Sequence, residues 1–315
     1  MQIVLQENFA EIERRFMKIL VTGGTVFASR FTAEYFARNN EVYVLNRGSK
    51  QQSEGVHAIV CDRHKLGDTL KKYEFDAVLD VCGYNETDVR DLLGGLGKFG
   101  TYIFVSSSAV YPETLAQPFR EENDIGVNKI WGDYGLNKIR AERYLAENCP
   151  NSYIIRPPYL YGKMNNLYRE AFIFECAEQN RPFYVPRDGK MRLQFFDIED
   201  MCRVMEILLE KQPKQRVFNV GNPESVSVLE WVELCCKTLG KTPEFRFVER
   251  DIEQRSYFPF YDYEYFLGVE KMLELMPETK PLEEGLKQSY AWFKDNRGEV
   301  RRKNYFEFID KNLRG

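Results

Sequence analysis

The first half of the chain alternates short runs of β-branched and aliphatic residues with segments of helix length, and this alternation constrains the fold more than any other feature. Nearly continuous apolar strands separated by helices are typical of a parallel sheet covered on both faces. The sequence therefore predicts an α/β, Rossmann-like doubly wound parallel sheet. The expected strands are 18–22, 41–46, 58–61, 77–81, 101–106 and 152–156, and the expected helices are 27–38, 86–96 and 134–147.

After residue 156 the pattern changes to a region punctuated by prolines and glycines, with one strand expected at 215–220 and amphipathic helices at 229–239 and 283–294. This pattern predicts a smaller C-terminal substrate lobe beside the sheet, and a charged tail that is a helix or a loosely held terminus. The predicted division is a dinucleotide-binding domain at 17–165 with late sheet segments near 195–220, a substrate-binding lobe at 166–194 and 221–300, an N-terminal extension at 1–16 and a tail at 301–315.

Composition disfavours several classes of protein. No stretch reaches the 18 apolar residues of a membrane span, and residues 1–16 lack the order of a secretory signal. A net charge of −4 gives no global field that would gather nucleic acid. The seven cysteines lack CxxC spacing, which favours a reducing, cytoplasmic setting. With only two histidines and no ligand spacing, we expect no metal site.

A glycine turn joins the first strand to the first helix. Gly23 and Gly24 follow Thr22, and apolar residues at helical spacing begin with Phe27. A strand, a glycine turn and a helix N-terminus together form a phosphate cradle, because backbone N–H groups and the helix dipole face the anion. A tight connection with no ligand would use the same glycines, so the turn alone leaves both interpretations open.

The segment 19–27, ILVTGGTVF, resembles the first turn of the extended and atypical short-chain dehydrogenase/reductase superfamily, in its NAD-dependent epimerase/dehydratase family, where the turn is usually TGGxGFxG. Val26 and Ser29 stand at the second and third glycine positions. The pattern GGTxF is similar to the atypical branch that includes the chloroplast stem-loop RNA-binding proteins. The resemblance implies that phosphates either sit farther out or meet a turn rebuilt around the hydroxyls of Thr22 and Thr25.

Residues Asn46 and Arg47 end the second strand, where an NAD site places a carboxylate for the ribose hydroxyls. Donors and positive charge there suit a 2′-phosphate, so we expect NADP, with NAD as the alternative. A solvated basic turn would have the same composition. Together with contacts that the family resemblance implies, the predicted cofactor-binding set is Gly23, Gly24, Thr25, Val26, Phe27, Asn46, Arg47, Asp62, Val81, Cys82, Pro157, Pro158 and Tyr159.

Tyr134 and Lys138 stand four residues apart, so a helix places both on one face. An ammonium near a phenol favours the phenolate, which is useful for proton transfer. Two other YxxxK pairs, beginning at Tyr159 and Tyr290, do not follow a strand that ends in serine. The catalytic residues predicted here are Ser107, Tyr134 and Lys138, with Ser107 hydrogen-bonding the substrate oxygen.

Segment 134–145, YGLNKIRAERYL, resembles the family's YGxSKxxAExxL, and segments 155–162, 194–200 and 217–221 resemble its later motifs. Ser106 and Ser108 are expected to point into the sheet or to cap the turn. Tyr159 stands where nucleotide-sugar enzymes carry an Asn, and Asp197 replaces a His. Arg192 fits a surface salt bridge as well as a ligand contact. The predicted substrate-binding set is Tyr84, Ser108, Asn165, Asn166, Arg192 and Gln194.

These residues predict an NAD(P)-dependent epimerase or reductase that transfers a hydride at a hydroxyl or carbonyl of a sugar or nucleotide-sugar-like substrate. Dehydration is disfavoured because Ser108 and Ala109 occupy the positions of the acid pair that it needs. The alternative is a non-enzymatic RNA-binding or regulatory protein on the same scaffold. The expected partner is a small sugar-like molecule, with no membrane or nucleic acid, and the sequence leaves pairing as a homodimer open.

Overall fold

The computed structural model describes residues 16–249 and 251–314, and the expectation for an extension at 1–16 lies outside the described residues except at Phe16. Its main sheet is parallel in the order β11-β6-β5-β4-β1-β2-β3, which confirms the expected Rossmann-like α/β fold. The sheet strands are β1 Lys18–Thr22, β2 Glu41–Asn46, β3 Val56–Val60, β4 Glu74–Asp80, β5 Lys98–Val105, β6 Tyr153–Arg156 and β11 Val217–Asn219.

Two of these strands start earlier than their hydrophobic pattern suggests. Glu74 pairs with Lys98 in register at the amino ends of β4 and β5, three residues before each expected start. Both side chains are exposed and form an ion pair with each other. An analysis of apolar runs misses these residues because their backbones join the ladder while their side chains stay in water.

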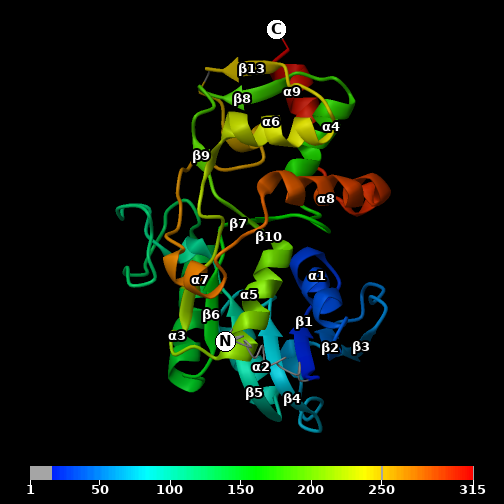
Figure 1. The fold of residues 1–315 in the computed structure, drawn as a ribbon, viewed down its shortest axis with the longest axis vertical. Helices are drawn as coiled ribbons and strands as arrows, with labels where there is room; N and C mark the ends of the chain where they lie inside the picture. Colours follow the sequence, from blue (N-terminus) through cyan, green and yellow to red (C-terminus); the bar gives the residue numbers. More distant parts are fainter. Residues whose placement is uncertain (1–15, 250, 315) are drawn as a thin grey trace, which may run out of the picture.

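Helices cover both faces of the sheet, with α1 and α5 packed together on one face and α2 and α3 on the other (Figure 1). Ile19 and Val21 enter one hydrophobic core, whereas Leu20 enters the second. All three are completely buried, and each contributes about 1.5–3 kcal/mol of hydrophobic stabilisation. The helices of this part are α1 Phe27–Phe36, α2 Glu86–Gly95, α3 Asp133–Asn148 and α5 Ile198–Lys211, with short 3₁₀ turns η1 Arg63–Lys65 and η2 Ser108–Val110.

The second half of the chain, apart from α5 and β11, forms a lobe and its connections beyond the carboxyl ends of the sheet strands (Figure 1). The tail joins it: Tyr305 in α9 is buried and stacks on Tyr168, with ring centroids 5.6 Å apart. The lobe and its connections contain the helices α4 Glu170–Glu178, α6 Val228–Thr238, α7 Glu270–Leu275, α8 Leu282–Asp295 and α9 Tyr305–Asn312, and the 3₁₀ turns η3 Gln254–Ser256 and η4 Arg297–Glu299. Its strands pair as β7 Tyr159–Tyr161 with β10 Phe195–Asp197, β8 Phe183–Pro186 with β13 Phe245–Val248, and β9 Arg192–Leu193 with β12 Val226–Ser227.

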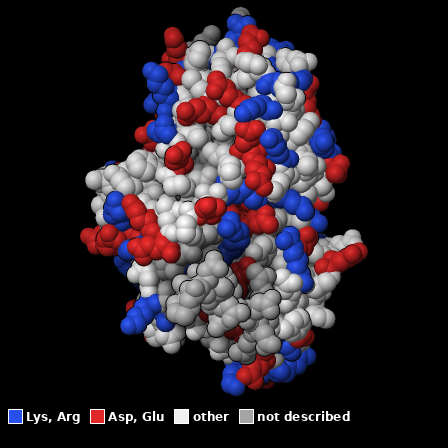
Figure 2. Space-filling view, in the orientation of Figure 1, with Lys and Arg blue, Asp and Glu red and all other residues white. Residues whose placement is uncertain are grey.

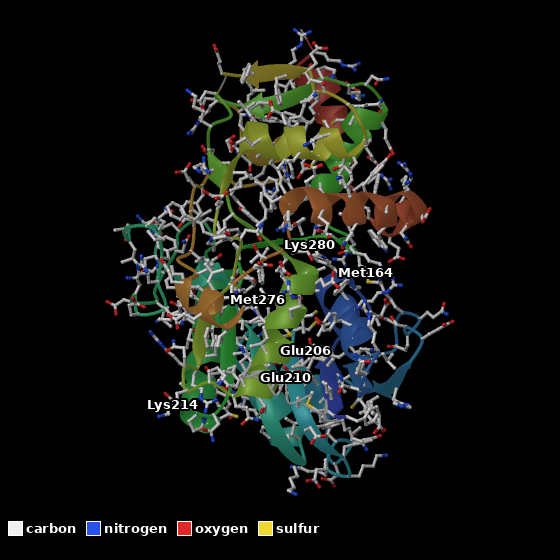
Figure 3. The ribbon with its side chains drawn as sticks, viewed as in Figure 1. Met164, Glu206, Glu210, Lys214, Met276 and Lys280 are labelled. Atoms are coloured by element: carbon white, nitrogen blue, oxygen red, sulfur yellow. The ribbon has the colours of Figure 1, made fainter. Side chains whose placement is uncertain are left out.

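An ionic cluster around Lys280 fastens the lobe to the sheet domain. Its ammonium lies at the junction of α5 and α8 and donates to Asp197 at 3.1 Å, to Glu199 at 2.5 Å and to Gln288 at 2.9 Å (Figure 3). Burial raises the pKa of Asp197 to about 6, although Lys280 acts in the opposite direction. Helix α8 packs closely against Tyr161 of β7 because Gly285 has no side chain. A Cβ at Gly285 would lie 2.3 Å from the Tyr161 hydroxyl.

Candidate active site

The glycine turn after β1 has the backbone that its sequence predicts. Gly23 and Gly24 have φ of +86° and +79°, a region that favours glycine. A Cβ on Gly24 would lie 2.4 Å from Cγ1 of Val44, and one on Gly23 would lie 2.6 Å from Sγ of Cys82. The turn therefore packs closely against β2 and against the end of β4.

Helix α1 begins at the carboxyl edge of the sheet with its first amide groups uncapped. Val26 is the N-cap residue, in extended conformation, and offers no side-chain hydrogen bond. The Ser29 hydroxyl donates to the Val26 carbonyl at 3.1 Å, so it is used inside the turn. The first N–H groups of an uncapped helix suit a phosphate, and here they belong to Phe27, Ala28 and Ser29, directly after Thr25 and Val26.

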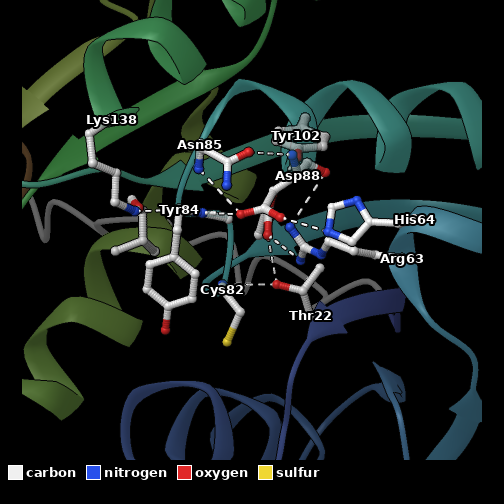
Figure 4. Close-up of polar contacts among 12 residues, drawn as sticks. Thr22, Arg63, His64, Cys82, Tyr84, Asn85, Asp88, Tyr102 and Lys138 are labelled. Carbon is white, nitrogen blue, oxygen red and sulfur yellow. Dashed lines mark hydrogen bonds and ion pairs between the residues drawn. The ribbon is translucent and has the colours of Figure 1, made fainter. Parts of the chain in front are cut away.

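Thr22 is not available for a phosphate, which corrects one of the two expectations for this turn. Its hydroxyl donates to Asp80 Oδ1 at 2.7 Å and accepts from the Cys82 backbone N–H at 3.0 Å (Figure 4). The residue is completely buried beneath the turn. Its function in the structure is to tie the end of β1 to the end of β4.

Asp80 is completely buried and is the centre of a polar network below the turn. Figure 4 labels its partners Thr22, Arg63 and Tyr102. Its carboxylate also accepts from Arg63 at 2.9 Å and from the Tyr102 hydroxyl at 2.7 Å. Burial alone would raise the pKa of Asp80, but the Arg63 guanidinium and the hydrogen bonds hold it below the usual value. This ionised carboxylate joins three neighbouring strands and η1 directly under the predicted cofactor site.

Lys138 lies deeper than the sequence predicts. Its ammonium donates to the carbonyl oxygens of Gly83 at 2.6 Å and Val105 at 2.7 Å, and it lies 5.4 Å from the ring centroid of Tyr84 (Figure 4). The expected pairing with the Tyr134 hydroxyl is not formed, because a buried ammonium needs acceptors and the strand-end carbonyls supply them. Burial lowers the pKa of Lys138 to about 8.

This lowered pKa predicts how stability depends on pH. Lysine in an unfolded chain has a pKa of about 10.4, so between about pH 8 and pH 10 the unfolded state binds more protons at this position. The free energy of unfolding of the protein, minus that of Lys138→Met, should therefore rise with pH across this window. Denaturant titrations at several pH values measure the difference. A stability difference that stays constant or falls as pH rises would contradict the lowered pKa of Lys138.

Tyr134 lies at the start of α3 and keeps 40% of its surface exposed. Desolvation of its phenol raises the pKa of Tyr134, while a hydrogen-bonding Ser107 hydroxyl and the charge of Arg169 lower it. Tyr84 lies close enough for the two phenols to interact. Tyr134, Ser107 and Tyr84 therefore form an accessible group of hydroxyls above the buried Lys138.

The three serines after β5 make different contacts from one another. Ser107, not its neighbours, caps the following turn, since its Oγ accepts from the Ala109 N–H at 3.2 Å. Ser106 does point inward, and its hydroxyl donates to Glu142. Ser108 is buried and its hydroxyl interacts with Tyr265, so it faces the lobe.

Gly135 allows the helix that carries Tyr134 to reach this serine turn. A Cβ at Gly135 would lie 2.3 Å from the Ala109 carbonyl oxygen. Any other residue would push the start of α3 away from η2 and so separate Tyr134 from Ser107. The glycine of the segment YGLNK is therefore needed for close approach, which the sequence analysis did not recognise.

A buried ion pair holds α3 against the sheet. Arg156, at the end of β6, donates to Glu142 Oε1 at 3.0 Å and Oε2 at 2.5 Å, and to the Tyr111 hydroxyl at 2.8 Å. The Tyr111 hydroxyl donates in turn to Asn219 at 2.7 Å. This network fixes the helix below Tyr134 and Lys138. Neither Glu142 nor Arg156 was predicted as a site residue, because both contribute by positioning other groups.

The two predicted ribose-binding residues, Asn46 and Arg47, differ in how free their side chains are to contact a ligand. The Asn46 amide donates to the Gly23 carbonyl at 2.8 Å and to Gln52, while its oxygen accepts from the Gly48 N–H. Asn46 therefore supports the glycine turn. Arg47 is exposed, and its charge acts on Asp62, whose carboxylate caps η1 at the end of β3.

Two of the predicted substrate-binding residues are buried and make their hydrogen bonds within the protein. Gln194 is buried, and its amide bonds to backbone groups of Asn222 and Leu267. Asn165 donates to Glu170 at 2.9 Å. These contacts leave neither amide for a ligand, so both are corrected to structural residues. Buried amides need partners, and here the protein itself provides them.

The remaining predicted residues lie at different depths. Arg192 donates to the Ser225 hydroxyl at 2.8 Å and to the Ser225 carbonyl, so among the described residues it does not form the surface salt bridge that was considered. Asn166 is buried, and its carbonyl accepts from the Arg301 N–H. Pro157 and Pro158 are buried beside Tyr159, which lies within an aromatic cluster. Val81 is nearly buried at the end of β4.

None of the helices in the described part of the chain is long and apolar enough to cross a membrane. Among residues 16–249 and 251–314, no three His, Cys, Asp or Glu side chains group as metal ligands.

Comparison with known proteins finds one matching family model and individual relatives that the chain resembles. A model of the NAD dependent epimerase/dehydratase family matches residues 19–221. The chain is 28% identical over 301 residues to the chloroplast stem-loop binding protein of 41 kDa b of Arabidopsis thaliana, covering 87% of this chain and 78% of the relative. It is 21% identical over 333 residues to a dTDP-glucose 4,6-dehydratase of Haemophilus influenzae, covering 88% and 98%.

Solved structures share the fold. The UDP-glucuronic acid 4-epimerase from Bacillus cereus, in complex with UDP-glucuronic acid and NAD, superposes with a TM-score of 0.69 at 20% identity, covering 89% of this chain and 99% of the other. A UDP-N-acetylglucosamine 4-epimerase from Methanobrevibacter ruminantium superposes with a TM-score of 0.73 at 17% identity and the same coverage.

Proposed function

Since the chain belongs to the NAD dependent epimerase/dehydratase family, we propose that it is an NAD(P)-dependent epimerase or reductase acting on a sugar or nucleotide-sugar-like substrate. The observation that carries this proposal is the contact between Tyr134 and Ser107, above the buried Lys138, at the sheet edge where the Gly23–Gly24 turn opens. Hydride transfer at a hydroxyl-bearing carbon needs a proton acceptor beside a nicotinamide, and this edge offers both positions.

In the proposed mechanism, Tyr134 exchanges the proton of the substrate hydroxyl. Ser107 hydrogen-bonds the same substrate oxygen and favours the phenolate of Tyr134. Lys138 holds a positive charge beneath the site, fixed by the Gly83 and Val105 carbonyls. A bound nicotinamide would supply the hydride chemistry beside Tyr134, as acceptor from a substrate hydroxyl carbon or as donor to a carbonyl.

The glycine turn supports the placement of a dinucleotide. Gly23 and Gly24 allow the turn to close against β2, and the uncapped amides of 27–29 suit the pyrophosphate of a dinucleotide. Val26 has a branched side chain where family members usually have glycine, which hinders close approach of a phosphate to the backbone. We therefore propose that the cofactor binds more weakly than at an unmodified turn.

We further propose a preference for NADP, because Arg47 is exposed beside the end of β2, where no carboxylate follows. Arg47→Ala should weaken NADP binding by about 1.5 kcal/mol, roughly tenfold, and leave NAD nearly unchanged. Calorimetric titration of both cofactors measures this, with Lys65→Ala as a matched exposed cation. Equal losses for the two cofactors, or tighter NAD binding by the unaltered protein, would contradict a phosphate-binding Arg47.

Epimerisation or reduction is favoured over dehydration at this site. The acid pair that dehydration needs is replaced by Ser108, which is buried against Tyr265, and by Ala109, which has no ionisable group. Incubation with NADP⁺ or NAD⁺ and a panel of free and nucleotide-linked sugars tests the function. Reduced nicotinamide or an epimerised sugar supports the proposal, and a 4-keto-6-deoxy product contradicts the reaction type.

The similarity to a stem-loop binding protein favours RNA binding as a second candidate function. Against it, the chain carries a net charge of −4, and the face in Figure 2 intersperses acidic and basic side chains. Retention of a stem-loop RNA at low salt that is lost steeply as salt rises would support binding through phosphates. Quenching of protein fluorescence by cofactor, without RNA retention, supports the enzyme.

A further inference from the structure

Two pairs of aromatic side chains in the described part of the chain carry buried polar atoms without a hydrogen bond. One pair is Tyr159 Oη with Trp131 Nε1, whose ring centroids lie 6.2 Å apart, and the other is Tyr161 Oη with Trp231 Nε1, whose centroids lie 5.7 Å apart. Buried tyrosine hydroxyls and indole N–H groups usually have a partner. The two pairs differ in what surrounds them.

The inner pair, Tyr161 and Trp231, is enclosed in the lobe. Both side chains are completely buried, and Trp231 stacks on the buried ring of Phe195 with centroids 3.6 Å apart. Helix α8 closes over the Tyr161 hydroxyl at Gly285. The inner pair is therefore part of the hydrophobic core, and it provides a comparison for the other pair.

The outer pair, Tyr159 and Trp131, borders the candidate active site. The Trp131 ring lies 6.5 Å from the Tyr134 ring, centroid to centroid. The charge of Arg169 acts on the phenols of both Tyr134 and Tyr159. Tyr159 also interacts with Tyr265, whose hydroxyl interacts with the serine turn after β5. The unpaired atoms of the outer pair therefore share their surroundings with the predicted proton-transfer group.

The turn before α3 holds the Trp131 indole in place. Asn128 is buried, and its side-chain oxygen accepts from the N–H groups of Ile130 at 2.9 Å and Trp131 at 3.2 Å. Its amide donates to the Tyr111 carbonyl at 2.8 Å. The Trp131 carbonyl accepts from the Tyr134 N–H at 3.2 Å. Trp131 is therefore built into the turn that begins the helix carrying Tyr134.

Tyr261 covers the outer pair on the solvent side. Its partly exposed ring packs edge-on against the Trp131 indole, with centroids 5.0 Å apart. Because Nε1 of Trp131 is buried, a ligand reaches it when a covering ring moves. Tyr134 is fixed at the start of α3, whereas Tyr261 lies in the loop between η3 and α7. Tyr261 is therefore the ring that gives access.

We propose that Trp131 Nε1 and Tyr159 Oη donate hydrogen bonds to one oxygen of the substrate's sugar, distinct from the oxygen that Ser107 and Tyr134 hold. This inference rests on the proposed function and extends it, since it adds two substrate-binding residues and requires a second hydroxyl or carbonyl oxygen near the reacting one. Two buried donors lose more when a ligand leaves them unpaired than when it pairs them, so a substrate without this oxygen is disfavoured.

Indole N–H resonances of the full chain test the inference directly. The sequence has three tryptophans, and Trp131→Phe identifies the signal of Trp131. Adding UDP-glucose or dTDP-glucose should shift that signal downfield, as expected for a new hydrogen bond. The signals of Trp231 and Trp292 should stay in place, because both side chains are buried in the lobe. UDP and dTDP, which lack the sugar, are the matched ligands and should leave the Trp131 signal unmoved.

Titration calorimetry of variants gives a second readout. Tyr159→Phe keeps the ring and removes the hydroxyl, so it should weaken binding of the sugar nucleotide about three- to tenfold, the effect of one hydrogen bond. Trp131→Phe should weaken it by a similar factor. Tyr161→Phe is the matched control, because it removes an equally unpaired hydroxyl from the inner pair. It should bind the same sugar nucleotide as tightly as the unaltered protein.

A Trp131 signal that stays in place with both sugar nucleotides would overturn the proposal. A shift of the same size with UDP, dTDP, NADP or NAD alone would also overturn it, as would unchanged affinity in both Tyr159→Phe and Trp131→Phe. These readouts do not depend on turnover. A sugar-dependent shift in a protein that never reduces a nicotinamide would support the donor pair and contradict hydride transfer. Sugar-dependent nicotinamide reduction with an unmoved Trp131 signal would do the reverse.

Discussion

Replacing Tyr134 with phenylalanine is expected to lower kcat by about 10²–10⁴-fold, with little change in cofactor affinity. The substitution removes the titrating hydroxyl while the ring stays packed near Trp131. Ser107 would keep its turn-capping contact, since that bond uses the Ala109 backbone. Steady-state kinetics on the substrate found in the sugar panel, with cofactor titration in parallel, measures both quantities.

Tyr144→Phe provides the control, because Tyr144 lies on the same helix and packs against the second core, away from Ser107. It should retain nearly full turnover. Unaltered turnover in Tyr134→Phe, or an equal loss in the two variants, would contradict the assignment of Tyr134 as the proton-transfer group.

Replacing Asp80 with asparagine is expected to lower the free energy of unfolding by about 3–5 kcal/mol. The change leaves Arg63, whose side chain is only 12% exposed, without its ionic partner. Because Thr22 also depends on Asp80, the glycine turn loses support and cofactor binding should weaken with stability. Chemical denaturation and cofactor titration of the same variant measure the two effects.

The pH dependence of this effect follows from the lowered pKa of Asp80. The stabilisation is present above the unfolded-state pKa of about 3.9 and is lost as pH falls through the lower folded-state value. The stability difference from Asp80→Asn should therefore shrink in acid.

The control for this substitution is Glu74→Gln, on the same strand. Glu74 and its partner Lys98 are both exposed, so this change should cost less than about 1 kcal/mol. If Asp80→Asn lowers the free energy of unfolding no more than Glu74→Gln does, the network around Asp80 does not stabilise the fold as described.

The sheet strands and the helices α1, α2 and α3 were predictable from sequence because apolar periodicity reports directly which side chains face the core, whereas α5, which also covers the sheet, was not predicted. Ile19, Leu20 and Val21 are all apolar, which indicates a strand buried on both faces, and the structure places them in two cores. The glycine turn was predictable for a similar reason, since two adjacent glycines after such a strand favour positive φ.

The parts that sequence reasoning missed depend on partners far away in the chain. Nothing local to Asp80 indicates that Arg63, Thr22 and Tyr102 will converge on it. Gln194 looked like a ligand contact, yet its amide satisfies backbone groups 28 and 73 residues away. Lys138 had the right helical face, but its acceptors come from two strand ends.

The most direct test of the central claim, that this sheet edge binds a nicotinamide dinucleotide for hydride transfer, is calorimetric titration of the full chain with NADP and NAD. The account predicts saturable binding of at least one cofactor, tighter for NADP, and tighter still in Val26→Gly, where the branched side chain no longer hinders the phosphates. Absence of binding by either cofactor at several times their ordinary cellular concentration would contradict it, and restoration by Val26→Gly would identify Val26 as the cause.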